Sequence, residues 1–404
     1  MRPEWQSAQR VDQLLASVAE KVRPLPSLAA NDAAEQRARL TRELTRGALP
    51  RPMSHHHRPV VETATYRLLD QARRLAEECP FGSLYRERLD ELELDLAILD
   101  AWGDDKRIRT LSARRYGRGD ELVHASNGQV VLSELAEQLL RKLPPAEASA
   151  RNVPPVAPRG ELSVEQLIQR AALGIGLDPV VRVEPRLSSL AATGERTVFL
   201  SARMFTLREA RRLVAHEVFG HLVVAANARA QPLRLLQVGL RGSFADQEGV
   251  SLFLEAALGL MCSDRLRTLA ARVVATQWLH RGATFGETAR MLHVQHGFAV
   301  ETSILTAERT YRGGGVARDA GYLAGFLRVR AALCAGQATL DELRRGRVAV
   351  EHAPALRTLE AQGFVRPASY RPSLVLSKAL TFGGTSCDTS PPNEAASLTM
   401  LELT

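Results

Sequence analysis

The stretch TLREARRLVAHEVFGHLVVAANA, residues 206–228, carries the strongest structural signal in this sequence of 404 residues. It begins with Thr206 and Glu209, whose Thr-x-x-Glu spacing is that of a capping box and predicts the start of a helix. Apolar residues then recur every three or four positions, so one face of the helix can be buried. These apolar residues are Leu213, Val214, Val218, Leu222 and Val223. The stretch therefore predicts a long helix packed inside the protein.

Two histidines and a glutamate lie in the middle of this helix, in the run His216-Glu217-Val218-Phe219-Gly220-His221. The familiar zinc-hydrolase motif HExxH places two histidines four residues apart on one helical face. Here they are five apart, which puts them about 140° apart around a regular α-helix at roughly 100° per residue. A π-bulge, which is frequent at functional sites, would restore the alignment. We therefore expect a distorted helix here, with Gly220 relaxing the steric demands of the turn.

A catalytic zinc site has three protein ligands, so a third residue has to join His216 and His221. Glu248 is the candidate, because it lies 27 residues after His221 at the start of another helical pattern. Glu255, on the same predicted helical face, is a supporting residue or an alternative ligand. Glu217 is then expected to be the general base that takes a proton from water. A chance HExxxH run is the competing interpretation, but the apolar flanks favour burial, and buried His and Glu side chains need partners.

The rest of the chain predicts an α+β fold that is predominantly helical. Apolar residues at helical spacing predict a helical N-terminal region over residues 1–145, packed on the remainder. Residues 146–160 are expected to form a linker, since five prolines occur between positions 143 and 160. A catalytic domain follows over residues 161–380. Residues 381–404, which are rich in Gly, Ser, Thr and Pro at first, are expected to be a flexible tail.

The predicted catalytic domain starts with a helix, two strands and the helix described above. Ser163 and Gln166 have the spacing of a capping box. The runs VVRVEP (180–185) and TVFLS (197–201) are typical of short strands. The second of these strands is expected to align an extended peptide by pairing along its edge.

Composition excludes several classes of protein. Lysine occurs only at Lys21, Lys106, Lys142 and Lys378, so 49 of the 53 basic residues are arginine, set against 45 acidic residues. The two signs are mixed, and no basic block occurs, so the net charge of +8 favours a solvated surface over a nucleic-acid partner. Three consecutive histidines at 55–57 lie between prolines and are expected to form a loop.

The cysteines and the apolar segments indicate a soluble, cytoplasmic protein. Cys79, Cys262, Cys334 and Cys387 are far apart, which argues against a disulfide framework and a cysteine-based zinc site. The N-terminus lacks the apolar core of a signal peptide. The longest apolar stretch, residues 249–263, is too short to span a bilayer. We therefore expect no membrane partner, and nothing in the sequence specifies an oligomeric state.

Several ordered motifs resemble those of a known family. After HEVFGH at 216–221 come NARAQP at 227–232, QEGVS at 247–251, ERTYRGGG at 308–315 and ARDAGYLAGF at 317–326. This order resembles the proteins named for a QEGLA motif, described in bacteria as modulators of flavohaemoglobin expression and related to the microtubule-associated tyrosine carboxypeptidase of animals. The resemblance extends upstream through LSARRYG at 111–117 and downstream to about residue 375. QEGVS replaces QEGLA, and Phe219-Gly220 replaces the commoner Gly-Thr, without removing a ligand or the base.

The resemblance implies a zinc metallopeptidase with a zincin-like core and one Zn²⁺ per chain. By that resemblance the metal ligands are His216, His221 and Glu248, and the catalytic glutamate is Glu217. The animal members remove a C-terminal tyrosine, so a carboxypeptidase acting on the C-terminus of a peptide or protein is expected. The alternative is a non-catalytic regulatory or binding protein that keeps its metal for structure.

Further residues of these motifs are candidates for supporting roles. We expect Tyr311 to stabilise the oxyanion, and Arg312 with Arg309 to bind the substrate carboxylate, since arginine forms paired hydrogen bonds with carboxylates. The alternative is that both arginines pair with acidic neighbours and that the glycines after them form a tight turn. Asn227 and Gln231 are expected to stabilise the turn after the metal helix. Other histidines, more typical of core or surface positions than of ligands, are His280, His293 and His296.

Overall fold

The computed structural model describes residues 3–28, 32–53, 59–125, 128–145, 152–158 and 160–382. Within these residues the chain is predominantly helical with three small sheets, which confirms the expected α+β class. The predicted histidine loop at 55–57 lies outside the described residues. No helix in the described part of the chain is both long and apolar enough to cross a bilayer. The cytoplasmic location stays a prediction.

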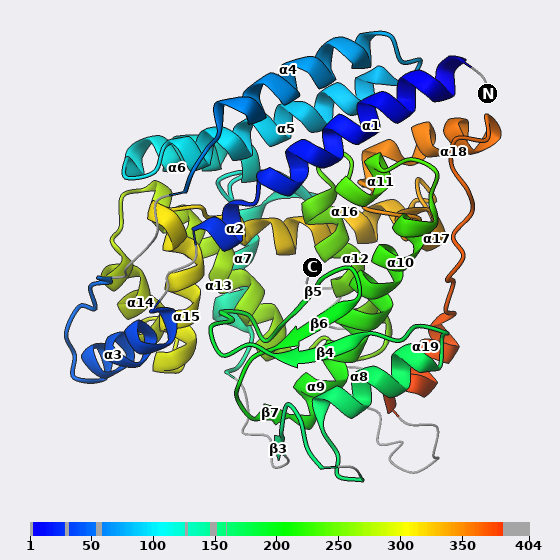
Figure 1. Cartoon of the computed structure of the whole chain (residues 1–404). Helices are drawn as coiled ribbons and strands as arrows, with labels where there is room; N and C mark the ends of the chain where they lie inside the picture. Colours follow the sequence, from blue (N-terminus) through cyan, green and yellow to red (C-terminus); the bar gives the residue numbers. More distant parts are fainter. Residues whose placement is uncertain are drawn as a thin grey trace.

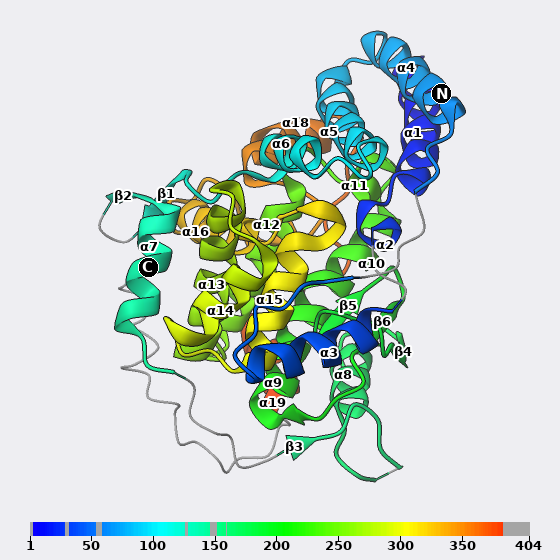
Figure 2. The ribbon, with the colours of Figure 1, turned by 90° about the vertical axis from the view of Figure 1, so that its left-hand side faces the viewer.

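The N-terminal third is built mainly from helices, which pack in separate groups on the rest of the molecule. Helices α1, α4 and α5 pack side by side, while α3 packs against α14 and α15 (Figures 1 and 2). A β-hairpin and α7 follow and pack on α13 and α16. The elements are α1 (Pro3–Lys21), α2 (Pro24–Ser27), α3 (Ala33–Thr45), α4 (Thr63–Glu77), α5 (Gly82–Asp100), α6 (Asp105–Tyr116), β1 (Leu122–Ala125), β2 (Gly128–Val131) and α7 (Leu132–Lys142).

A three-stranded sheet lies next to α8 (Val164–Leu173) and precedes the metal helix. Both predicted strands are present, as β4 (Val180–Val183) and β6 (Thr197–Leu200), and they are parallel. The sequence pattern missed β5 (Ala191–Thr193), which pairs antiparallel with β6. The strand order is therefore β4-β6-β5. Because β6 is paired on both sides, the prediction that it offers an edge to a peptide is wrong.

The predicted linker contains some regular structure. Within residues 146–160, β3 (Asn152–Val153) pairs antiparallel with β7 (Phe205–Thr206) at the start of the metal helix. Ser163 caps α8 by accepting a hydrogen bond from the Gln166 backbone. The Gln166 side chain bonds to the Pro158 carbonyl instead of completing a capping box.

The C-terminal half is helical almost throughout. The elements are α9 (Leu207–Leu213), the π-helix η1 (Val214–Leu222), α10 (Val223–Ala230), α11 (Leu235–Val238), α12 (Ser243–Ala257), α13 (Ser263–His280), α14 (Phe285–Val294), α15 (Val300–Tyr311), the 3₁₀ turn η2 (Arg312–Gly314), α16 (Ala320–Cys334), α17 (Leu340–Leu343), the 3₁₀ turn η3 (Val350–His352), α18 (Ala353–Ala361) and α19 (Leu374–Phe382). Helix α19 includes residues 381 and 382, the first two of the predicted tail; residues 383–404 lie outside the described part.

One hydrophobic core runs through most of the chain. Its fully buried side chains include Leu15 and Ile108 from the N-terminal helices, Phe205 and Phe219 from the metal-helix segment, and Phe364 near the C-terminal end. Because these segments share one core, the central helices are held from both ends of the sequence. The predicted division into an N-terminal region, a linker and a catalytic domain stays a prediction.

Candidate metal centre and active site

The helix that carries His216 and His221 has the irregularity that the spacing requires. Thr206 and Glu209 form the predicted capping box at its start. Residues Val214–Leu222 then form a π-helix, in which residues five positions apart share a face. The Nε2 atoms of His216 and His221 consequently lie 3.2 Å apart. The distortion is longer than the expected single-turn bulge, because it covers nine residues.

Gly220 is needed for helix packing and not for an unusual backbone angle. It is not among the glycines with positive φ. A Cβ atom at this position would lie 2.1 Å from Oγ of Ser251 and 2.9 Å from its Cβ. Ser251 belongs to α12, so Gly220 allows the π-helix and α12 to approach closely. That this glycine also relaxes the steric demands of the distorted turn stays a prediction.

Helix α12 brings Glu248 to the two histidines. Its Oε2 atom lies 3.3 Å from Nε2 of His216 and 3.5 Å from Nε2 of His221. Zinc bonds of about 2.0–2.2 Å in a tetrahedral arrangement place the ligand atoms roughly 3.3–3.5 Å apart. The three atoms thus have the separations of three corners of a tetrahedral zinc site. They form the group of possible metal ligands found among the described residues.

The chemistry of these atoms also fits a cation. Glu248 Oε2 is buried and has no hydrogen-bond partner among the described residues. An orphaned buried carboxylate oxygen is costly unless something compensates it. Two imidazole nitrogens and one carboxylate oxygen match the His₂Glu set of catalytic zinc sites. The residues present therefore fit the ion that the sequence implies.

Glu255 supports the site from behind. Its Oε1 atom lies 2.7 Å from Nδ1 of His216, and Arg265 binds both of its oxygens at 2.9 Å. The Glu255 side chain is fully buried, and Arg212 approaches to 3.8 Å. Since Nδ1 of His216 faces a carboxylate, Nε2 is left to face Glu248 and His221. Glu255 is therefore placed to support His216, and it lies outside the group of possible metal ligands found among the described residues.

Three carboxylates set the electrostatics around His216. Burial lowers the pKa of His216, but Glu248 and Glu255, with a further contribution from Glu217, outweigh it and raise that pKa to about 9. Burial raises the pKa of Glu255, yet Arg265 and Arg212 more than offset it and hold this pKa well below its usual range. The centre thus attracts positive charge, as a cation site must.

Glu217 is held next to this centre by the sheet. Its side chain is 3% exposed, and Thr193 Oγ1 donates a hydrogen bond of 2.7 Å to its Oε2. Thr193 is the last residue of β5, which lies at the edge of the three-stranded sheet. The edge strand of the sheet that lies next to Glu217, the candidate base, is therefore β5.

The sequence as a whole was compared with known proteins. A family model described as microtubule-associated tyrosine carboxypeptidase matches residues 46–381. The chain belongs to this family. The match starts well upstream of the resemblance seen from the motifs and includes all of them. No curated protein matches the chain.

In this member of the microtubule-associated tyrosine carboxypeptidase family, the structure does not bring Tyr311 to the histidine and glutamate cluster. Its hydroxyl bonds to Thr288 at 2.8 Å and donates to the Ala283 carbonyl at 2.5 Å. Both partners belong to α14 and the turn before it. The hydroxyl is therefore occupied, and the expectation that Tyr311 stabilises the oxyanion is withdrawn.

The Arg309 side chain likewise binds another residue of the protein. It is 9% exposed and forms a buried ion pair with Asp319. Burial lowers its pKa, but the Asp319 carboxylate more than offsets this effect. Arg309 thus has an acidic neighbour as its partner, which is the alternative expectation for this residue.

Arg312 differs from Arg309 because its hydrogen-bond partner is neutral. Its Nη2 donates to Ser188 Oγ at 2.6 Å. Burial and the nearby Arg309 lower the pKa of Arg312 to about 10. The next three residues, Gly313, Gly314 and Gly315, all have positive φ and form the tight turn that was the alternative expectation. Arg312 remains a candidate for binding an anion.

Asn227 and Gln231 bind a segment far along the chain. The Asn227 amide donates to the carbonyls of Arg344 and Tyr370 and accepts from the Tyr370 backbone. Gln231 makes a pair of 2.9 Å bonds with the Arg366 backbone. Their role is structural, as expected, but they secure the C-terminal segment against the metal helix instead of stabilising the local turn.

The other histidines lie outside the cluster. His293 Nδ1 bonds to the Phe298 carbonyl, and His296 lies against Trp278. Burial lowers the pKa of His280. None of the three belongs to the metal-ligand group found in the described residues.

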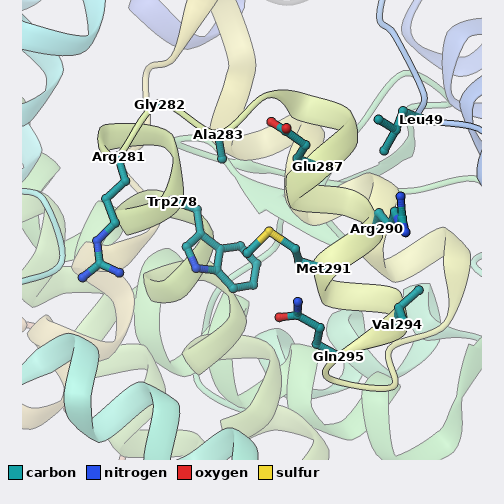
Figure 3. Close-up of a pocket in the computed structure, with 10 residues that line it drawn as sticks. All are labelled: Leu49, Trp278, Arg281, Gly282, Ala283, Glu287, Arg290, Met291, Val294 and Gln295. Atoms are coloured by element: carbon teal, nitrogen blue, oxygen red, sulfur yellow. The ribbon is translucent and has the colours of Figure 1, made fainter.

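A surface pocket of about 630 Å³ lies beside α13 and α14 (Figure 3). Trp278, Met291 and Val294 give it an apolar lining, with Arg281 and Arg290 among its charged residues. It contains no residue of the histidine and glutamate cluster. Ala283 also lines this pocket. Because the Ala283 carbonyl accepts a hydrogen bond from Tyr311, the Tyr311 hydroxyl lies near the pocket.

Sequence reasoning missed Thr193 and Arg265. Thr193 lies in a strand of three residues, too short for a periodic pattern, and its contact with Glu217 depends on how the sheet packs. Arg265 is ten residues from Glu255 and on another helix, so no local spacing links the two.

Proposed function

We propose that this protein is a zinc-dependent carboxypeptidase with a zincin-like core, which removes a C-terminal residue, such as tyrosine, from a peptide or protein. The observation that carries the proposal is the grouping of His216, His221 and Glu248 at tetrahedral separations, next to the buried carboxylate of Glu217. The family model supports this class of reaction, since its description names a tyrosine carboxypeptidase.

The proposed chemistry divides between the ion and the protein. Zinc held by the three residues would polarise the scissile carbonyl and increase the acidity of a water molecule. Glu217 accepts the proton as this water adds to the carbonyl carbon, and it delivers the proton to the amine as the C–N bond breaks. The hydrogen bond from Thr193 occupies Oε2 of Glu217 and leaves Oε1 for proton transfer. The products are a shortened peptide and a free amino acid.

Arg312 and β5 are proposed to position the substrate. A guanidinium partly removed from water, whose hydrogen-bond partner within the described residues is a serine hydroxyl, gains most from an incoming carboxylate. The outer edge of β5 carries no partner strand in the described part of the chain and ends at the residue that binds Glu217. An extended peptide paired along this edge would pass beside the general base.

The experiment combines metal analysis with digestion of a peptide library, read by mass spectrometry. Purified protein is expected to hold about one zinc per chain and to shorten peptides by one C-terminal residue. His216→Ala should lose zinc. Glu217→Gln should keep zinc but lose the activity, whereas Glu301→Gln, at an exposed position, should match the wild type.

The same experiment separates the two candidate functions. Zinc-loaded wild-type protein that shortens no peptide would favour a structural metal in a regulatory or binding protein. Folded wild-type protein that takes up no zinc would contradict the metal centre itself. Activity that survives in Glu217→Gln would show that another residue is the base.

A further inference from the structure

Helix α16 is pressed against the helix that carries Glu248. A Cβ atom on Gly325 would lie 1.9 Å from the Ala245 carbonyl oxygen, and one on Gly249 would lie 2.3 Å from the Gly325 carbonyl oxygen. The two glycines therefore allow the backbones of α12 and α16 to touch. The close approach at Gly249 lies next to Glu248, so side chains of α16 near this point face the part of α12 that carries the proposed ligand.

Tyr322 is such a side chain. Its ring centre lies 6.0 Å from that of Phe244, with the rings nearly perpendicular. Phe244 precedes Glu248 by four residues on α12, so both project from the same face of that helix. Tyr322 is 8% exposed. Burial, and then the charge of Glu248, raise its pKa.

Arginines surround the Tyr322 ring. The guanidinium of Arg272 lies over the ring, 4.8 Å from its centre, and that of Arg309 lies 5.9 Å from it. Asp319, itself 3% exposed, holds Arg309 in place through their ion pair. A guanidinium has no acceptor atom, so neither arginine can take the phenol proton, which stays available for another acceptor.

Peptide hydrolysis requires a donor for the oxygen that becomes negative when water adds to the carbonyl. Tyr311 does not supply it, because its hydroxyl is bound to α14. We propose that Tyr322 is a catalytic residue that donates a hydrogen bond to this oxyanion, and that Arg309 and Asp319 are positioning residues that hold its ring. The inference rests on the proposed function, since it assigns a role within that reaction.

The test compares two tyrosines that each lose only a hydroxyl. Tyr322→Phe is expected to lower kcat about 10²- to 10³-fold, as does removal of one oxyanion donor in other hydrolases, with little change in KM. Zinc content and melting temperature should stay as in the wild type. Tyr311→Phe is the matched control, and its kcat should remain within about twofold of wild type, whatever its effect on stability.

Binding provides a readout that does not depend on turnover. A phosphinic peptide mimics the tetrahedral oxyanion and should bind Tyr322→Phe about 10²-fold more weakly than wild type. An uncleaved substrate peptide bound to Glu217→Gln should be affected less than twofold when Tyr322→Phe is added, since the ground state lacks the oxyanion.

Positioning by Arg309 and Asp319 is tested with a double-mutant cycle. Asp319→Asn should lower kcat by about tenfold alone and cause little further loss in Tyr322→Phe, because it acts through the same hydroxyl. If Asp319→Asn fails to fold, Arg309→Lys serves the same purpose. Additive losses would overturn the positioning roles.

The outcomes distinguish this inference from the proposed function. Active wild-type protein whose kcat and phosphinate affinity survive Tyr322→Phe would overturn the role of Tyr322 alone. A large loss of kcat in Tyr311→Phe with none in Tyr322→Phe would return that role to Tyr311. A zinc-loaded wild-type protein without peptidase activity would overturn the proposed function and this inference with it.

Discussion

Nδ1 of His216 lies 2.7 Å from Oε1 of Glu255, inside a group in which Arg265 binds the same carboxylate through two bonds. A carboxylate behind a metal-binding histidine fixes its tautomer and ring orientation and increases its basicity. The direction in which Nε2 of His216 points is therefore determined by residues on α12 and α13, not by its own helix alone.

Glu255→Gln is expected to weaken zinc binding about 10- to 100-fold, because the neutral amide supports His216 less well. It should also destabilise the fold, since Arg265 and Arg212 would keep their buried charges without a counter-ion. Zinc affinity is measured by competition with a chelator, and stability by thermal unfolding. Glu134→Gln, at an exposed position on α7, is the control; equal effects of the two substitutions would contradict the role of Glu255.

Gly220→Ala is expected to lower the free energy of unfolding by about 1–3 kcal/mol, because the new methyl group would overlap Ser251 of α12. It should also weaken zinc binding, since Glu248 lies one helical turn from Ser251. Ser251→Gly removes the overlapping atoms and should restore much of both losses when combined with Gly220→Ala. Urea unfolding and chelator competition measure the two effects. The absence of rescue would show that Gly220 is needed for another reason.

Arg312→Ala is expected to raise KM by about 10²-fold for peptides with a free C-terminal carboxylate and to change kcat little, because it removes a binding contact made throughout the reaction. Peptides with an amidated C-terminus should be poor substrates of the wild type and should be affected little by the substitution. Steady-state kinetics on such peptide pairs measures this. Retained discrimination between acid and amide in Arg312→Ala would assign carboxylate binding to another residue.

Asp12 on α1 is expected to make stability depend on pH. Its buried carboxylate accepts bonds from Tyr85 and from the backbones of Arg234 and Leu235. Burial outweighs these bonds and raises its pKa from 3.8 to about 6. A carboxyl group whose pKa is higher in the folded than in the unfolded state stabilises the fold at low pH and loses that contribution as pH rises through about 6.

The contribution of Asp12 should therefore fall by about 1 kcal/mol between pH 5 and pH 8. Asp12→Asn cannot titrate, so the difference in unfolding free energy between it and the wild type should change by this amount over the same range. Urea unfolding at several pH values measures it. Asp178→Asn, at an exposed position, should give a flat difference, and a flat difference for Asp12→Asn would contradict the prediction.

The residues that meet at the metal centre could be predicted because their spacing is a local property of helices. Two histidines five positions apart, such as His216 and His221, cannot share one face of a regular α-helix, and the structure contains a π-helix at that place. The apolar pattern around Glu248 likewise placed it on a helix, and its meeting with the histidines follows from packing.

The roles of the arginine and tyrosine residues could not be predicted in the same way. Arg309 and Tyr311 are two residues apart, yet one binds Asp319 at the start of α16 and the other binds Thr288 of α14. Which partner each side chain meets is decided by the packing of several helices, and no periodicity reports it. The order of the strands could not be predicted either, because β5 has three residues and is too short to show an alternating pattern.

The bonds that Asn227 makes to the Arg344 and Tyr370 backbones also affect the order in which the protein can form during synthesis. Asn227 lies on α10, which continues directly from the π-helix, but Tyr370 is 143 residues further along. Gln247, beside Glu248, likewise donates hydrogen bonds to the carbonyls of Leu343 and Val348, which are synthesised much later. At about 5–20 residues per second, a ribosome needs roughly 7–30 s to make this interval. A nascent chain that already contains every proposed metal ligand therefore still lacks the segment that holds them in place, so competence to hydrolyse peptides should arise only after residue 370 has been made.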